Sequence, residues 1–223
     1  IIYTSTDSGE SWKIIMNRLE YSRFDWNIPY MKPRYNGGGN CVHWISDIKL
    51  SPFDCDKALF NTGTGLFMIT GLASGDVLVK PFCEGIEETV HLNVYTTPHG
   101  RNRIIDIIGD LGGFAFEDYD SECENSFANE NGDRYITCLN ADLTLSDPEY
   151  IVATPRGNWT GKTKGGLILS KDCGSTWERL PMPRGLSEFI DQKLDNIEKP
   201  NVDSGWTAIS ADGKRIMWAV AGG

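Results

Sequence analysis

The sequence predicts an all-β protein, on the evidence of its strand signals, its near lack of helical periodicity and a repeated turn motif. Short alternating or apolar runs are bounded by Gly, Asp, Asn and Pro, as strands usually are. We expect strands at residues 58–61, 65–70, 91–97, 103–108, 114–117, 150–154, 166–170, 206–210 and 215–220. The best helical candidate is a turn or two at residues 186–194. The pattern S-x-D-x-G-x-[ST]-W occurs at residues 5–12 and again at residues 170–177.

An internal repeat indicates how the strands are organised. The segments DIKLS and DLTLS begin at Asp47 and Asp142, 95 positions apart, and each precedes a strand that starts Gly-Leu. This spacing is about two units of the roughly 40–50 residues typical of a β-propeller blade. The two S-x-D-x-G-x-[ST]-W motifs lie 165 positions apart, near four such units. We therefore expect about five blades of four antiparallel strands, and more to close a ring, because an open propeller leaves strand edges unpaired.

The two motifs resemble the Asp-box of β-propeller glycosidases and related proteins. Their Asp side chain can accept hydrogen bonds from the turn backbone, their Gly can supply a positive φ, and we expect Trp12 and Trp177 to pack between blades. We interpret both motifs as turns that stabilise a hairpin, so they indicate the fold and not the function. Trp206 and Trp218 lie in predicted strands, and we expect them to be core residues.

Composition excludes several functional classes. The formal net charge of -10 over 223 residues argues against nucleic acid or an anionic membrane as a partner, whereas it suits a neutral polysaccharide or simply serves solubility. The six cysteines form no C-x-x-C pair, so we expect no metal site and no cofactor, and leave open whether they are free or bridged. No run of about 18 apolar residues is present. Because the chain starts at Ile1 within a predicted strand, we expect an internal piece of a longer protein.

The order of several further motifs resembles glycoside hydrolase family 74. The motifs are WISDI with SPFD (residues 44–54), TGTG (62–65), GIEET (85–89), GDLGGF (109–114), and SGWTAISADG with Met217-Trp218. The resemblance covers nearly the whole chain and would correspond to the middle of such an enzyme. It implies that about residues 1–45 end a first propeller and about residues 46–223 form part of a second.

The resemblance also implies an activity and a site. In that family two seven-bladed propellers face each other, and two aspartates, one from each, hydrolyse the β-1,4-glucan backbone of xyloglucan with inversion. Asp110 matches the second-propeller aspartate and would be the general acid, although Leu111 stands where the family has Ile or Val. The general base would lie outside this chain, which would then need the rest of the enzyme as its partner. The resemblance also implies a secreted, extracellular protein acting on xyloglucan or a related β-glucan.

Physical arguments agree with a split site. An inverting glycosidase needs its two carboxyl groups about 6.5–9.5 Å apart, and two facing propellers can provide that separation. A general acid must also stay protonated near neutral pH, which requires apolar surroundings or a neighbouring like charge. The apolar run at residues 103–108 could provide such surroundings for Asp110.

Other acidic residues are weaker candidates. Glu87 and Glu88 are adjacent, so in a strand they would point to opposite faces. One of them, and we favour Glu88, could bind sugar hydroxyls or alter the pKa of Asp110. Alternatively, both could stabilise a turn or a strand edge. Asp106 precedes Asp110 by four residues, and we expect both on one face of the same strand.

Exposed aromatic side chains are the expected glucan platforms, because the apolar faces of pyranose rings stack on flat rings. Trp26, Tyr30 and Tyr35 lie in a loop rich in Asn, Gly and Pro at residues 24–40, and Trp159 lies in another loop. Trp44 opens a motif strand and could equally be a platform or a core residue.

The alternative to an enzyme segment is a non-catalytic propeller module that binds glycan or protein. The GIEET and GDLGGF motifs favour the enzyme, because a pure binding propeller has no reason to keep them. A sialidase would need an arginine triad, which the sequence does not show. The three histidines form no recognisable triad and accompany no G-x-S-x-G elbow, which argues against a serine hydrolase.

Overall fold

The computed structural model describes residues 1–16, 44–86, 89–123, 126–157, 163–182 and 204–220. Within them the protein is all-β, with strands in antiparallel sheets and no helix, and hence no helix long and apolar enough to cross a membrane. The chain divides into two compact units, Ile1–Glu88 and Thr89–Gly223. The helix considered at residues 186–194 lies outside the described residues.

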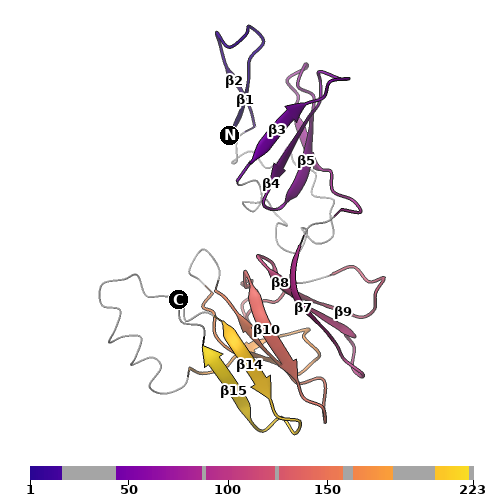
Figure 1. The fold of residues 1–223 in the computed structure, drawn as a ribbon, viewed down its shortest axis with the longest axis vertical. Coiled ribbons are helices and arrows are strands. Elements are labelled where there is room, and N and C mark those ends of the chain that lie inside the picture. Colours follow the sequence, from indigo (N-terminus) through magenta and orange to yellow (C-terminus); the bar gives the residue numbers. More distant parts are fainter. Residues whose placement is uncertain (17–43, 87–88, 124–125, 158–162, 183–203, 221–223) are drawn as a thin grey trace, which may run out of the picture. The chain divides into compact units, whose positions relative to one another are not determined.

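The first unit contains a hairpin and a four-stranded meander (Figure 1). The hairpin pairs β1 (Ile2–Thr4) with β2 (Lys13–Met16). The meander is β3 (Asp47–Leu50), β4 (Ala58–Thr62), β5 (Gly65–Thr70) and β6 (Leu78–Pro81), in sequence order. Every neighbouring pair is antiparallel, and the expected strands at residues 58–61 and 65–70 are confirmed.

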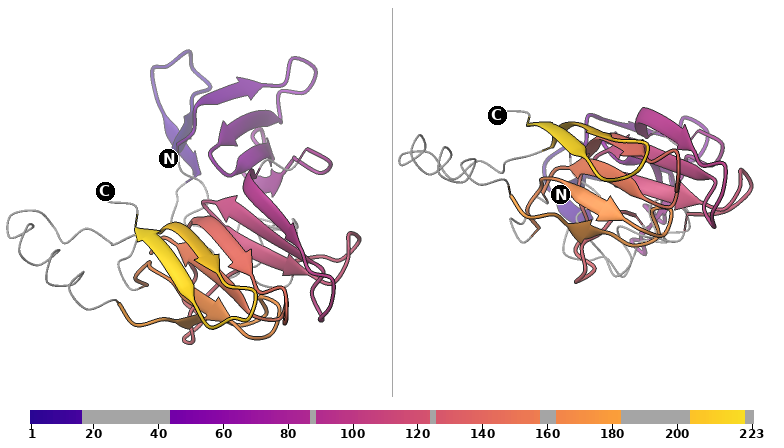
Figure 2. Two further views of the ribbon diagram at one scale, coloured as in Figure 1. Left: turned by 60° about the horizontal axis from the view of Figure 1, so that its bottom comes forward. Right: turned by 90° about the horizontal axis from the view of Figure 1, so that it is seen from below.

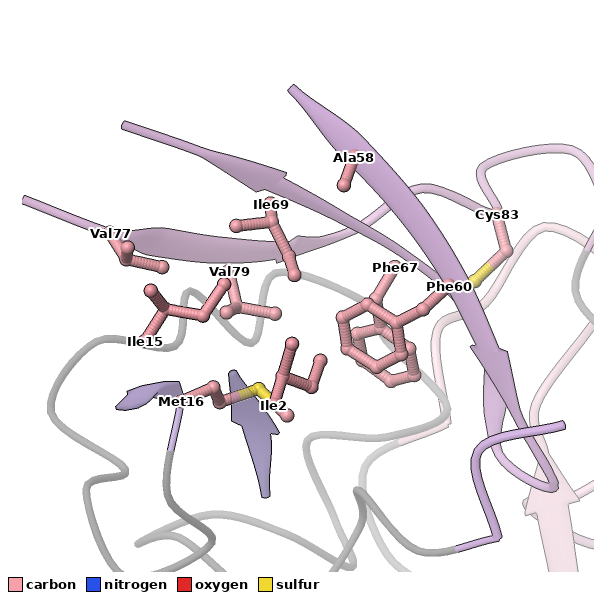
Figure 3. Packing of buried hydrophobic residues seen from close by; sticks show 10 residues of the cluster. All are labelled: Ile2, Ile15, Met16, Ala58, Phe60, Phe67, Ile69, Val77, Val79 and Cys83. Atoms are coloured by element: carbon pink, nitrogen blue, oxygen red, sulfur yellow. The ribbon is translucent and has the colours of Figure 1, made fainter. Parts of the chain in front are cut away.

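One apolar cluster joins the hairpin and the meander of the first unit. Phe60 and Phe67 stack at its centre, with ring centroids 5.3 Å apart. Figure 3 shows side chains from the hairpin directed toward those of the meander. The buried members are Ile2, Ile15, Met16, Ala58, Phe60, Phe67, Ile69, Val77, Val79 and Cys83.

The described residues of the second unit form three sheets. The first is β7 (Val90–Thr96), β8 (Ile104–Gly109) and β9 (Gly112–Phe116). The second is β10 (Cys138–Leu143), β11 (Ile151–Pro155), β12 (Ile168–Ser170) and β13 (Glu178–Arg179). The third pairs β14 (Gly205–Ile209) with β15 (Ile216–Val220), and Figure 2 shows it beside the second. The strands expected here from sequence are confirmed to within about two residues at each end.

The inner faces of the first two sheets meet in the main core of this unit. Ile105 and Ile107 of β8 are fully buried. They share a cluster with residues of β10, β11 and β12 and with the loops that follow β9 and β12. Its other buried members are Phe127, Tyr135, Cys138, Ala141, Ile151, Ala153, Ile168 and Trp177.

Both S-x-D-x-G-x-[ST]-W motifs form hairpin turns with the same hydrogen bonds, as predicted. In the first, between β1 and β2, the Asp7 carboxylate accepts from the Ser11 N–H at 2.9 Å and from the Ser11 hydroxyl. In the second, between β12 and β13, Asp172 accepts from the Thr176 N–H at 2.8 Å and from the Thr176 hydroxyl at 2.6 Å. The Gly of each motif has a positive φ, 94° at Gly9 and 81° at Gly174.

The motif tryptophans differ from each other. Trp177 is buried and packs on Phe127, with ring centroids 4.5 Å apart, as expected. Trp12 is 65% exposed, so the expectation that it packs between blades is wrong in this structure.

The prediction that Trp206 is a core residue is also wrong, because Trp206 lies on the outer face of β14 and is 66% exposed. Trp218, on the opposite face, packs partly buried against the cluster of Val152, Leu167 and Ile209.

Five of the six cysteines lie in the described residues, and Cys55, Cys138 and Cys173 are free thiols. Burial raises the pKa of the Cys138 thiol to about 12 and that of the Cys123 thiol to about 11. These two thiols therefore behave as small apolar side chains.

Gly113 permits β9 to approach its neighbours closely. Its carbonyl accepts a hydrogen bond from the Phe127 N–H at 2.9 Å, which draws residues 126–137 along β9. A Cβ atom at Gly113 would lie 2.6 Å from Cε2 of Phe127 and 2.7 Å from the carbonyl oxygen of Asp106. Any side chain here would force the sheet and the loop apart.

We therefore predict that Gly113→Ala lowers the free energy of unfolding by about 3 kcal/mol, the upper end of the usual range for overpacking a core. Gly132→Ala is the matched control: Gly132 has a φ of 78° but no atom within 4 Å of an added Cβ. It should cost only about 1 kcal/mol, from backbone strain. Denaturant unfolding compares the two, and equal losses would contradict the close approach at Gly113.

The second motif turn should make stability depend on pH. Burial disfavours the charged Asp172 carboxylate, but the hydrogen bonds from Thr176 and Ser170 outweigh it and lower the pKa of Asp172. A carboxyl whose pKa is lowered by folding stabilises the protein above its ordinary value near 4, and this contribution is lost as pH falls below that value.

We predict that Asp172→Asn is less stable than the unsubstituted chain at pH 6. Acidification from pH 6 to pH 2.5 should cost the variant less stability than it costs the unsubstituted chain. Denaturant unfolding at both pH values measures this difference. Parallel losses in the two proteins would show that the Asp172 hydrogen bonds do not contribute.

Candidate active site

Asp110 occupies the two-residue turn that joins β8 to β9, and its side chain is exposed. Its φ of 62° is in the left-handed region, which non-glycine residues avoid and which is enriched at functional sites. The expectation that Asp110 continues the strand on the same face as Asp106 is therefore wrong. The chain turns at Asp110, whereas Asp106 is 6% exposed within β8.

The backbone of this turn is held on both sides. The Asp110 N–H donates to Oγ1 of Thr137 at 3.0 Å, and the Leu111 N–H donates to the carbonyl of Gly109 at 2.8 Å. Gly112 has a φ of 83°, and its N–H donates to the carbonyl of Ile136 at 3.0 Å. The turn therefore presents one exposed carboxylate on a fixed backbone.

The isoleucines of β8 form a floor under this turn and do not surround the carboxyl. Ile105, Ile107 and Ile108 are at most 1% exposed, whereas Asp110 is exposed. Residues 103–108 thus do not provide the apolar surroundings expected for Asp110, because the isoleucine side chains pack into the core. What the strand supplies is rigidity.

A hydrogen-bonded chain of three side chains lies next to this turn, and the sequence did not reveal it. Nδ1 of His91 lies 2.8 and 3.0 Å from the two carboxylate oxygens of Asp106. Nε2 of His91 lies 2.6 Å from the Thr89 hydroxyl. The alignment depends on a register shift in β7 between His91 and Asn93, which places His91 opposite Ile108. Strand periodicity alone could not predict that shift.

The remaining predicted site residues are only partly located. Trp44 is 79% exposed, so it is not a core residue, and its φ is 53°. It belongs to the first unit, whereas Asp110 belongs to the second. The other candidates lie outside the described residues and stay predictions: Trp26, Tyr30, Tyr35, Glu87, Glu88 and Trp159. No group of three His, Cys, Asp or Glu side chains that could hold a metal ion occurs in the described part of the chain.

Comparison with known proteins identifies relatives that match nearly all of this chain. No protein-family model matches it. A xyloglucanase of Paenibacillus sp is 23% identical over 246 residues, covering 99% of this chain and 21% of its own length. An oligoxyloglucan-reducing end-specific xyloglucanase of Emericella nidulans is 27% identical over 254 residues, covering 99% of this chain and 30% of its own length. The chain thus spans less than a third of the curated relatives it matches.

Solved structures give the same result for the fold. The family 74 xyloglucanase of Xanthomonas campestris superposes with a TM-score of 0.69 at 21% identity, over 97% of this chain and 28% of its own. A family 74 enzyme of Niastella koreensis superposes with a TM-score of 0.64 at 18% identity, over 97% and 26%. Along nearly its whole length, the chain resembles a segment of the glycoside hydrolase family 74 xyloglucanases.

Proposed function

We propose that this chain is a segment of a glycoside hydrolase that cleaves the β-1,4-glucan backbone of xyloglucan with inversion, with Asp110 as general acid. The observation that carries the proposal is the turn itself. Asp110 presents an exposed carboxylate, its backbone is in the left-handed conformation, and it directly follows a strand whose residues are all buried. It does so within a chain whose curated relatives are named xyloglucanases.

The environment of Asp106 supports a general base outside this chain. Inversion needs a second carboxylate about 6.5–9.5 Å from the acid, with room for a water molecule. Asp106 is buried and bound by His91, so it is not free to activate that water. The base would come from the rest of the enzyme.

The proposed architecture follows the same resemblance. The described residues form five sheets in chain order, which agrees with about five blades. Residues 1–45 would end a first seven-bladed propeller and residues 46–223 would form part of a second. Secretion to the extracellular space, where xyloglucan is found, belongs to the same proposal.

We predict that Asp110→Asn in the intact enzyme lowers the turnover of xyloglucan by roughly 10²–10⁴-fold, the usual contribution of a general acid. Folding and glucan affinity should be unchanged, because the amide has the shape of the carboxyl group. An aryl glycoside with a good leaving group should lose less activity than xyloglucan. Asp120→Asn, which removes an exposed charge from another turn of the same unit, is the matched control and should keep full turnover.

The 223-residue chain alone should release no reducing sugar from xyloglucan, because it lacks the opposing carboxylate. Clear turnover by the chain alone would place both carboxylates within it and contradict the split site. Full turnover of the Asp110→Asn enzyme would contradict the role of Asp110 itself. Glucan binding without any hydrolysis by the intact protein would point instead to a binding module.

We also predict that the aromatic residues expected from the sequence to be platforms bind the glucan by stacking. Alanine substitution of Trp26, Tyr30, Trp44 or Trp159 should weaken binding of xyloglucan oligosaccharides by about 1–2 kcal/mol each where the ring is desolvated by the sugar. Trp206→Ala, which removes an exposed ring from the outer face of β14, is the control. Calorimetric titration measures the affinities, and unchanged values for all four variants would remove the platform proposal.

A further inference from the structure

With a neutral imidazole, the hydrogen-bonded chain of Thr89, His91 and Asp106 has one direction. A carboxylate only accepts hydrogen bonds, so the Asp106 oxygens at 2.8 and 3.0 Å require a proton on Nδ1 of His91. In the neutral imidazole Nε2 is then an acceptor, and the Thr89 hydroxyl at 2.6 Å donates to it. The lone pairs of the Thr89 oxygen remain available to a further donor.

The burial of the three residues is graded from the core outward. The Asp106 side chain is 9% exposed, the His91 side chain is 54% exposed, and Thr89 is half-buried. A buried carboxylate is costly unless it is paired, so His91 is strongly held in place. The outer end of the hydrogen-bonded chain is Thr89, which is half-buried.

Thr89 lies at the same end of the β7–β8 pair as Asp110. Val90 pairs with Gly109, so Thr89 and Asp110 each stand one residue beyond the same cross-strand pair. The strands are close at this point, since a Cβ atom added to Gly109 would lie 3.2 Å from Cβ of Val90. The register shift after His91 is a β-bulge, a feature that often redirects a side chain next to an active site.

We propose that Thr89 binds a sugar hydroxyl of the glucan next to Asp110, with His91 and Asp106 as positioning residues that hold the Thr89 hydroxyl in one orientation. An ion pair that only linked β7 to β8 would need Asp106 and His91 but not Thr89. The inference rests on the proposed function, since it takes glucan as the ligand of the surface around Asp110.

Binding is measured in the intact enzyme carrying Asp110→Asn, so that xyloglucan oligosaccharides are not cleaved during titration. Thr89→Val keeps the β-branched shape and removes the hydroxyl, and it should weaken affinity about tenfold, as one lost hydrogen bond does. Thr89→Ser restores the hydroxyl and should retain most of the affinity.

A double-mutant cycle separates positioning from a general structural effect. Asp106→Asn should also weaken affinity, because an amide can donate to Nδ1 and so reverse the hydrogen bonds along the chain. Added to Thr89→Val, it should cause no further loss, since its effect passes through the missing hydroxyl. The ¹⁵N NMR spectrum of His91 in the 223-residue chain should show the Nδ1–H tautomer, and Asp106→Asn should shift it to Nε2–H.

Unchanged affinity in Thr89→Val would overturn the proposal, and so would losses that add fully in the double variant or an intact enzyme that does not bind xyloglucan. The proposed function fails separately, if Asp110→Asn leaves turnover intact. The affinity measurements still decide the role of Thr89 in that case, because they do not depend on cleavage.

Discussion

The packing of β8 against β10 is the contact on which the second unit depends. β8 is hydrogen bonded to β7 on one side and β9 on the other, and all of its side chains are buried. Ile105 and Ile107 share one apolar cluster with Cys138 and Ala141 of β10. A strand fixed along both edges and both faces cannot slide or tilt without opening the core. The position of Asp110 at its end is therefore set by the core together with the hydrogen bond from the Asp110 N–H to Thr137.

Polar side chains of β10 link its sheet to the neighbouring sheet by hydrogen bonds. The amide oxygen of Asn140 accepts from the Thr207 N–H at 2.8 Å, and the Asp142 carboxylate accepts from the Ile209 N–H at 2.8 Å. The two side chains of β10 thus satisfy backbone groups along β14, which would otherwise be buried and unpaired. Asn102 similarly donates to the Cys173 carbonyl at 2.9 Å and links the β7–β8 loop to the second motif turn.

The proposed chemistry uses this rigidity in two ways. A general acid must hold its carboxyl group at one place relative to the scissile bond, and a hairpin end fixed by Thr137 and the β8 core does so. Hydrogen bonds to substrate hydroxyls are effective when their protein partners are already oriented before binding. The buried carboxylate of Asp106 would orient the Thr89 hydroxyl by holding His91 in place. The left-handed conformation of Asp110 costs some stability, which the surrounding core offsets.

The sequence by itself determined the strands and the two motif turns, because each depends on local periodicity or on a local hydrogen-bond pattern. The tertiary structure decided which apolar side chains are buried. The sequence predicts that Trp12 and Trp206 are packed, but both are exposed in the structure. Burial depends on whether another element covers the side chain and not on the sequence of the strand or turn that carries it. It also decided the contact of His91 with Asp106, which requires a register shift in β7. The shift inserts one extra residue into β7, and the alternation of side chains along a single strand does not mark such an insertion.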